Sequence, residues 1–115
     1  MVRDPRALLW DARASGDTIE RFLSGKRFDD YLADEMLRSA VERQFEILGE
    51  ALAQLSKTNP KLAARIPDAS NAIGFRNVLI HGYAKVDSAI VWQAATQSLP
   101  KLRSSVDALL RELGE

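Results

Sequence analysis

The stretch that decides the fold is residues 29–57, which read DDYLADEMLRSAVERQFEILGEALAQLSK. Apolar side chains recur there every three or four positions, which is the period of one face of an α-helix. The two acids at its start suit the positive end of a helix dipole, and Asn59-Pro60 is a stop signal. The pattern predicts one long amphipathic helix from about Asp29 to Lys57.

The same period appears on both sides of this helix. Asp4-Pro5 has the form of a helix cap followed by a first-turn proline, and the helix it opens should run to about Ser24, before Gly25. Further helical patterns cover about residues 70–81, 89–98 and the segment after Pro100, a proline expected to break or kink the chain. Because no segment alternates as a strand does, we expect an all-α, up-and-down bundle of four to five helices in a single domain, residues 1–115.

Composition limits the class of protein. A chain with 46% hydrophobic and 28% charged residues is ordinary for a soluble globular protein. No apolar run approaches the roughly 20 residues that cross a bilayer, and the first five residues lack a signal-peptide core. No cysteine is present to form a disulfide or a thiolate metal site. We therefore expect a cytoplasmic protein with no membrane contact.

Charge is balanced overall but not locally. The 16 basic residues equal the 16 acidic ones, which argues against a nonspecific coat for nucleic acid. Residues 28–57 carry three bases and seven acids, whereas residues 58–87 carry four bases and two acids. Any anion-binding surface should therefore lie in the second of these segments.

The polar side chains best suited to catalysis lie close together in residues 74–83, GFRNVLIHGY. At about 100° per residue, His81 points away from the predicted core face, with Asn77 about 40° from it and Arg76 on the flank. The residues predicted to form that core face are Ala72, Phe75, Val78 and Leu79. The single histidine therefore shares an outward patch with an arginine and an asparagine, although a lone histidine is more often an ordinary surface residue.

These side chains suit cleavage of RNA without a metal. A guanidinium fork fits phosphate oxygens, and an imidazole can move a proton near neutral pH. Attack by a ribose 2′-hydroxyl needs both a base and an acid, which one His81 cannot easily supply in one step. Ile73 and Ile80 lie together on a second side of the predicted helix, where another surface should cover them. We therefore expect a homodimer that brings two copies of His81 together.

Two features of the long helix leave alternatives open. Gly49 costs about 1 kcal/mol relative to alanine in a helix interior. It indicates close approach of another helix, or else room for a ligand or partner chain beside Glu46 and Glu50. Glu42, Glu46 and Glu50 recur every four residues. Pairing with arginine, as between Arg43 and Glu46, explains them better than a metal site does.

The segment Arg76-Asn77-x-x-x-His81-x-Tyr83 resembles the R-x4-H-x-Y signature of the HepT-like branch of the HEPN superfamily. The resemblance extends over roughly residues 4–113. It includes FEILGEA at residues 45–51, Ile66-Pro67, IGFRN at residues 73–77, and residues 86–92. Residues 68–71 lack the tryptophan often found there in the family, which bears on local packing and not on the site.

The resemblance implies a dimeric helical bundle with a metal-independent endoribonuclease site at the dimer interface and no cofactor. It implies the toxin half of a toxin–antitoxin system, in which Arg76 and His81 are catalytic and Asn77 supports them. It further implies that an MntA-type nucleotidyltransferase antitoxin transfers AMP to Tyr83. Two other hypotheses stay open: a noncatalytic helical partner that binds a nucleotide or a nucleotidyltransferase, and a purely structural dimerisation module.

Overall fold

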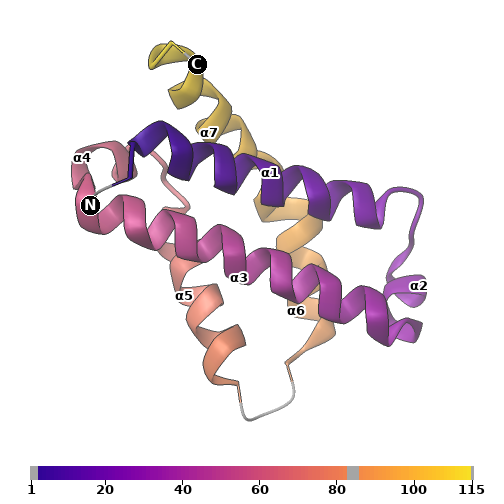
Figure 1. The fold of residues 1–115 in the computed structure, drawn as a ribbon. Coiled ribbons are helices and arrows are strands. Elements are labelled where there is room, and N and C mark those ends of the chain that lie inside the picture. Colours follow the sequence, from indigo (N-terminus) through magenta and orange to yellow (C-terminus); the bar gives the residue numbers. More distant parts are fainter. Residues whose placement is uncertain (1–2, 83–85, 115) are drawn as a thin grey trace.

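Two long helices, α1 (Pro5–Leu23) and α3 (Glu35–Thr58), lie side by side and run in opposite directions (Figure 1). The structure is a computed structural model that describes residues 3–82 and 86–114. The contact between α1 and α3 is the most extensive in these residues. Their facing apolar side chains form the main part of the core.

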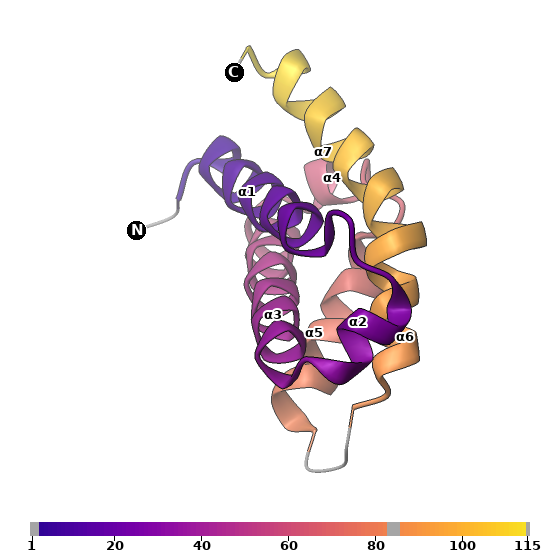
Figure 2. The same ribbon diagram turned by 90° about the vertical axis from the view of Figure 1, so that its right-hand side faces the viewer.

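The shorter elements pack around this pair. They are α2 (Phe28–Ala33), α4 (Pro60–Ala63), α5 (Ala69–His81), α6 (Ser88–Gln93), a π-helical segment η1 (Ala94–Ser98) and α7 (Leu99–Glu112). Helix α5 lies against α3, and α7 lies against α1 (Figures 1 and 2). The described residues contain no strand, so the predicted all-α bundle is confirmed. No helix among them is long and apolar enough to span a membrane.

The first helix begins and ends where the sequence predicts. The Asp4 carboxylate accepts a hydrogen bond from the Arg6 backbone N–H at 2.8 Å, and Pro5 follows as the first helical residue. Gly25, just beyond the end of α1, has a φ of 74°, a conformation that glycine adopts without strain. This turn sends the chain back toward α2.

The predicted second helix is divided in two, so its expected start near Asp29 is only the start of α2. Asp34 leaves the helical region, with φ −114° and ψ 97°, and its carboxylate accepts a hydrogen bond from the Leu37 backbone N–H at 3.0 Å. Aspartate favours such a cap over a helix interior. The break allows Tyr31 to be fully buried, with its ring 5.7 Å from that of Trp92.

Of the break or kink expected at Pro100, the structure excludes the break. The helix continues from α6 to α7 through η1, where the Leu99 backbone N–H donates to the Ala94 carbonyl, five residues earlier. A widened π turn of this kind accommodates a residue that lacks an N–H and whose ring clashes with the preceding turn. Figure 2 shows α6 and α7 as one continuous length of helix.

The core joins α1, α2, α3, α6 and α7. Among the described residues, eleven large side chains are almost fully excluded from solvent: Tyr31, Leu8, Leu9, Ile19, Leu48, Leu52, Leu55, Leu110, Val41, Val91 and Val106. Burying each such aliphatic side chain favours folding by about 1.5–3 kcal/mol. Helix α5 rests on this core chiefly through α3.

Candidate active site

Gly49 fixes the position of α5 on α3. A Cβ atom added to Gly49 would lie 2.3 Å from the Arg76 Cβ and 3.0 Å from the Ala72 carbonyl oxygen. Both distances are shorter than ordinary van der Waals contact. The interpretation of Gly49 as a point of close helix approach is therefore confirmed, and the residue that approaches it is Arg76.

The core face predicted for α5 is correct in part. Phe75 and Leu79 are half-buried against the core, and the Phe75 ring lies 5.2 Å from that of Phe45. Val78, however, is 59% exposed. The physical reason is the gap at Gly49, which admits the stem of Arg76 and turns Val78 away from the core.

The two isoleucines of α5 do not form the shared exposed surface expected from sequence. Ile73 is half-buried and packs against the hydrophobic core, so that part of the expectation is wrong. Ile80 is 46% exposed. The apolar side chains that α5 leaves open to solvent are therefore Val78 and Ile80.

Arg76 is bonded through both of its terminal nitrogens. Its side chain is only 17% exposed, and its Nη2 lies 2.6 Å from Oε2 of Glu50. Its Nη1 donates to Oδ1 of Asn77 at 2.7 Å. Its Nε is buried and has no hydrogen-bond partner among the described residues. The structure thus brings Arg76 and Asn77 together, as the spacing suggests, and adds Glu50.

Sequence reasoning did not pair Glu50 with Arg76. Its signal was its position next to Gly49, because a glycine in the middle of a helix marks the place where another element approaches. The residue after such a glycine lies at the edge of the contact. Which residue of the approaching helix it meets depends on the angle and register of α5, which only the tertiary structure sets.

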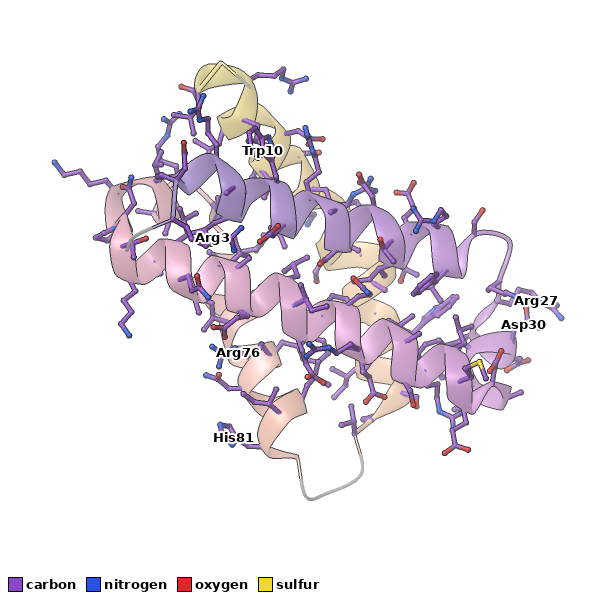
Figure 3. The ribbon with its side chains drawn as sticks, in the orientation of Figure 1. Arg3, Trp10, Arg27, Asp30, Arg76 and His81 are labelled. Carbon is purple, nitrogen blue, oxygen red and sulfur yellow. The ribbon has the colours of Figure 1, made fainter. Side chains whose placement is uncertain are left out.

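His81 is the last residue of α5 and is exposed. Figure 3 shows its side chain and that of Arg76 on the same side of α5, about one turn and a half apart. Among residues 3–82 and 86–114, no hydrogen bond or ion pair engages the imidazole. Tyr83, the expected site of modification, lies outside the described residues.

A groove of about 320 Å³ runs beside Arg76 between α1, α3 and α5. Its lining residues include Arg3, Asp11, Arg43, Glu46, Glu50, Gln54, Arg76 and Ile80. Each arginine in the groove has a carboxylate partner: Arg3 with Asp11 at 2.8 Å, Arg43 with Glu46 at 3.3 Å, and Arg76 with Glu50 at 2.6 Å. The predicted pairing of Arg43 with Glu46 is confirmed, and the groove is close to neutral.

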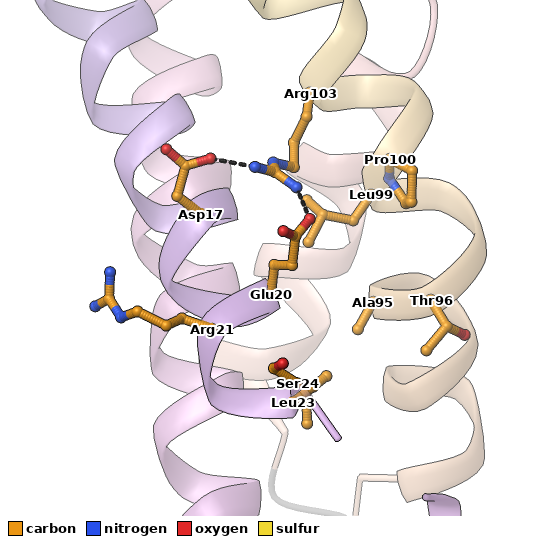
Figure 4. Close-up of a pocket in the computed structure, with 10 residues that line it drawn as sticks. All are labelled: Asp17, Glu20, Arg21, Leu23, Ser24, Ala95, Thr96, Leu99, Pro100 and Arg103. Carbon is orange, nitrogen blue, oxygen red and sulfur yellow. Dashed lines mark hydrogen bonds and ion pairs between the residues drawn. The ribbon is translucent and has the colours of Figure 1, made fainter. Parts of the chain in front are cut away.

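A larger pocket, of about 670 Å³, lies between the C-terminal part of α1 and the η1–α7 segment (Figure 4). Of the two arginines that line it, Arg21 and Arg103, Arg103 lies between Asp17 and Glu20 of α1 and is hydrogen-bonded to both carboxylates. This pairing links α1 to α7 and leaves no net positive charge for an anion. Size alone therefore does not make this pocket the better candidate.

The Arg76–His81 side of α5 has the chemistry that the larger pocket lacks. A guanidinium held against the protein can bind an anionic oxygen pair in a fixed orientation. An exposed imidazole one to two turns away can take or give a proton. Together these groups can bind a phosphodiester and assist a proton transfer at it.

Known proteins with similar sequences bear on this site. The profile of the family described as Ribonuclease HepT-like matches residues 13–109. The chain is 31% identical to a protein of Thermococcus cleftensis named "Probable ribonuclease HepT", over 95% of this chain and 98% of that protein. It is 34% identical to TTE0752 of Caldanaerobacter subterraneus, provisionally named an RNase, over 82% of each chain.

A third relative is MJ1380 of Methanocaldococcus jannaschii, also provisionally named an RNase, with 29% identity over 91% of this chain and 95% of that protein. No solved structure matches the chain significantly. The family match spans most of the helical bundle, from within α1 to within α7, and includes Arg76 and His81. The chain therefore belongs to the HepT-like ribonuclease family.

Proposed function

We propose that the chain is the toxin of a toxin–antitoxin system and acts in the cytoplasm as a metal-independent endoribonuclease. Arg76 and His81 are the catalytic residues, and Asn77 supports Arg76. The observation that carries this proposal is the projection of Arg76 and His81 from one side of α5, with the imidazole open to solvent. Membership of a ribonuclease family supports it.

In the proposed reaction, the imidazole of His81 accepts the proton of a ribose 2′-hydroxyl. The 2′-oxygen attacks the adjacent phosphorus, and the bond from phosphorus to the 5′-oxygen breaks, which leaves a 2′,3′-cyclic phosphate. The guanidinium of Arg76 compensates the charge that develops on the phosphoryl oxygens. The leaving 5′-oxygen takes a proton from a second, protonated imidazole.

A homodimer supplies that second imidazole. His81 of one copy would act as base and His81 of the other as acid, in a cleft between the two molecules. The uncovered side chains of Val78 and Ile80, on the same helix, support this arrangement because exposed apolar side chains favour burial against another surface. The site would then be incomplete in a single chain.

Inhibition in this proposal acts through Tyr83, two residues after His81. A cognate MntA-type nucleotidyltransferase transfers AMP from ATP to the tyrosine hydroxyl. The added phosphate would bring negative charge near Arg76 and repel RNA. Incubation with the antitoxin and ATP should increase the mass of the protein by one or more AMP units, and Tyr83→Phe should show no increase. An adduct that persists in Tyr83→Phe contradicts this mechanism.

The nuclease proposal is tested with purified protein, RNA and EDTA. We expect cleavage by the parent, at least 100-fold slower cleavage by His81→Ala on the scale of typical acid–base contributions, and resistance of a substrate with a 2′-deoxy sugar at the cut site. Thr58→Ala, on the exposed end of α3, is the control and should cleave as the parent does. No cleavage by the parent, or equal cleavage by His81→Ala, refutes the proposal and favours a noncatalytic binding partner.

A further inference from the structure

The carboxylate of Glu50 is paired with one terminal nitrogen of the Arg76 guanidinium. Its Oε2 lies 2.6 Å from Nη2 of Arg76, and its Oε1 accepts a hydrogen bond from Nε2 of Gln54 at 3.2 Å. The Nη1 of Arg76 is taken by Asn77. Both terminal nitrogens of the arginine therefore already have an oxygen partner in the free protein.

Of the two charged groups, Glu50 is the one that can move away. The stem of Arg76 packs on the backbone of α3 at Gly49, and its side chain is 17% exposed. The side chain of Glu50 is 54% exposed, and within residues 3–82 and 86–114 its carboxylate is bonded only to Arg76 and Gln54. A carboxylate and a phosphodiester are both monoanions that present two oxygens to a guanidinium. Glu50 therefore lies where an RNA phosphate would bind.

We propose that Glu50 sets the affinity of the site for RNA, because its carboxylate competes with the substrate phosphate for Nη2 of Arg76. This inference rests on the proposed ribonuclease function. When RNA binds, the carboxylate turns toward solvent, and the phosphate takes its place at Arg76. A change that removes the charge of Glu50 should strengthen RNA binding without altering the chemical step.

Glu50→Gln tests this because glutamine has the same shape and keeps an acceptor for Arg76. Ion pairs at a protein surface are typically worth less than about 1 kcal/mol, and the Glu50 side of this pair is open to solvent. The apparent KM for RNA should therefore fall by about fivefold at most, with kcat unchanged. The matched control is Glu46→Gln, one turn earlier on α3. It lines the same groove and pairs with Arg43, so it removes the same charge and should change KM by less than about twofold.

The experiment has two arms. Fluorescence anisotropy measures the Kd of a 2′-O-methyl oligonucleotide, which cannot undergo 2′-hydroxyl attack, and steady-state cleavage of RNA gives KM and kcat. We expect Glu50→Gln to bind the oligonucleotide a few-fold more tightly than the parent and Glu46→Gln do. Unchanged or weaker binding by Glu50→Gln overturns the inference, as does a loss of kcat at constant KM, which would mark an orienting role.

The two arms separate this inference from the proposed function. If the parent binds the oligonucleotide but cleaves no RNA, the nuclease proposal fails, and tighter binding by Glu50→Gln still supports competition at Arg76. If RNA is cleaved but Glu50→Gln binds no more tightly than Glu46→Gln, the nuclease proposal stands and the role of Glu50 is refuted. Absence of binding by both the parent and Glu50→Gln also refutes it.

Discussion

Replacement of Gly49 by alanine should separate α5 from α3. The new Cβ would lie 2.3 Å from the Arg76 Cβ and 3.0 Å from the Ala72 carbonyl oxygen. Neither atom is the end of a flexible side chain, so relief requires movement of the backbone of α5. An ordinary contact needs about 3.5 Å, and α5 must therefore move outward by roughly 1 Å.

Two opposing effects set the size of the change in stability. Alanine in place of glycine favours an α-helix by about 1 kcal/mol. Overpacking at a tight helix contact costs typically 1–3 kcal/mol, and so short a distance places this contact at the upper end. We expect a net decrease of about 2 kcal/mol in the free energy of unfolding. Because Arg76 is the residue displaced, RNA cleavage should fall more than stability alone explains.

Gly74 provides the matched control on α5. A Cβ at this position meets nothing within 4 Å, so Gly74→Ala should stabilise the protein by about 0.5–1 kcal/mol. Urea unfolding followed by circular dichroism at 222 nm measures both variants. The reasoning is refuted if Gly49→Ala is as stable as the parent, since the helices would then approach less closely than the structure shows.

Two further predictions concern stability at high pH and assembly. Burial raises the pKa of Tyr31 to about 12, with the charge of Glu42 as a smaller cause. The unfolded tyrosine loses its proton near pH 10, so the stability that the neutral ring provides is complete below pH 10 and falls by about 2 kcal/mol toward pH 12. Urea unfolding between pH 8 and 11.5 should show a shallower fall in the free energy of unfolding for Tyr31→Phe than for the parent. If stability falls equally with pH in both proteins, the raised pKa of Tyr31 is contradicted. For assembly, the double substitution Val78→Asp, Ile80→Asp should convert the expected dimer into monomers, as measured by sedimentation velocity. The control Met36→Asp, at an 82% exposed position on α3, should leave the dimer intact. A dimer that survives the double substitution would place the interface elsewhere.

The charge distribution of the chain explains why the candidate site is close to neutral. The acidic segment, residues 28–57, contributes Glu50 on α3, and the more basic segment, residues 58–87, contributes Arg76 on α5. The two segments meet where α5 packs on α3. The positive charge expected in the second segment is therefore present but already balanced in the free protein. Binding of a polyanion must then rearrange an ion pair as well as neutralise phosphates.

The class of fold and the ends of α1 and α5 could be predicted from the sequence, because hydrophobic periodicity, capping residues and glycine stops are local signals. The sequence predicted α1 and α5 closely and placed the tight contact at Gly49. It also grouped Arg76 with Asn77, since neighbours on one helix need no tertiary information. The break at Asp34 was not predicted, because an acidic residue near the start of a helix can either continue that helix or cap a new one.

The face of α5 that meets α3 could not be predicted from the sequence. Apolarity predicted Val78 inside, but the space over Gly49 admits the stem of Arg76 and leaves Val78 at the surface. The tertiary structure likewise decided that Glu50 is the partner of Arg76, a pairing across 26 positions of sequence. The physical reason is that helix propensity and periodicity depend on neighbours along the chain, whereas the orientation of one helix on another depends on the shape of both surfaces.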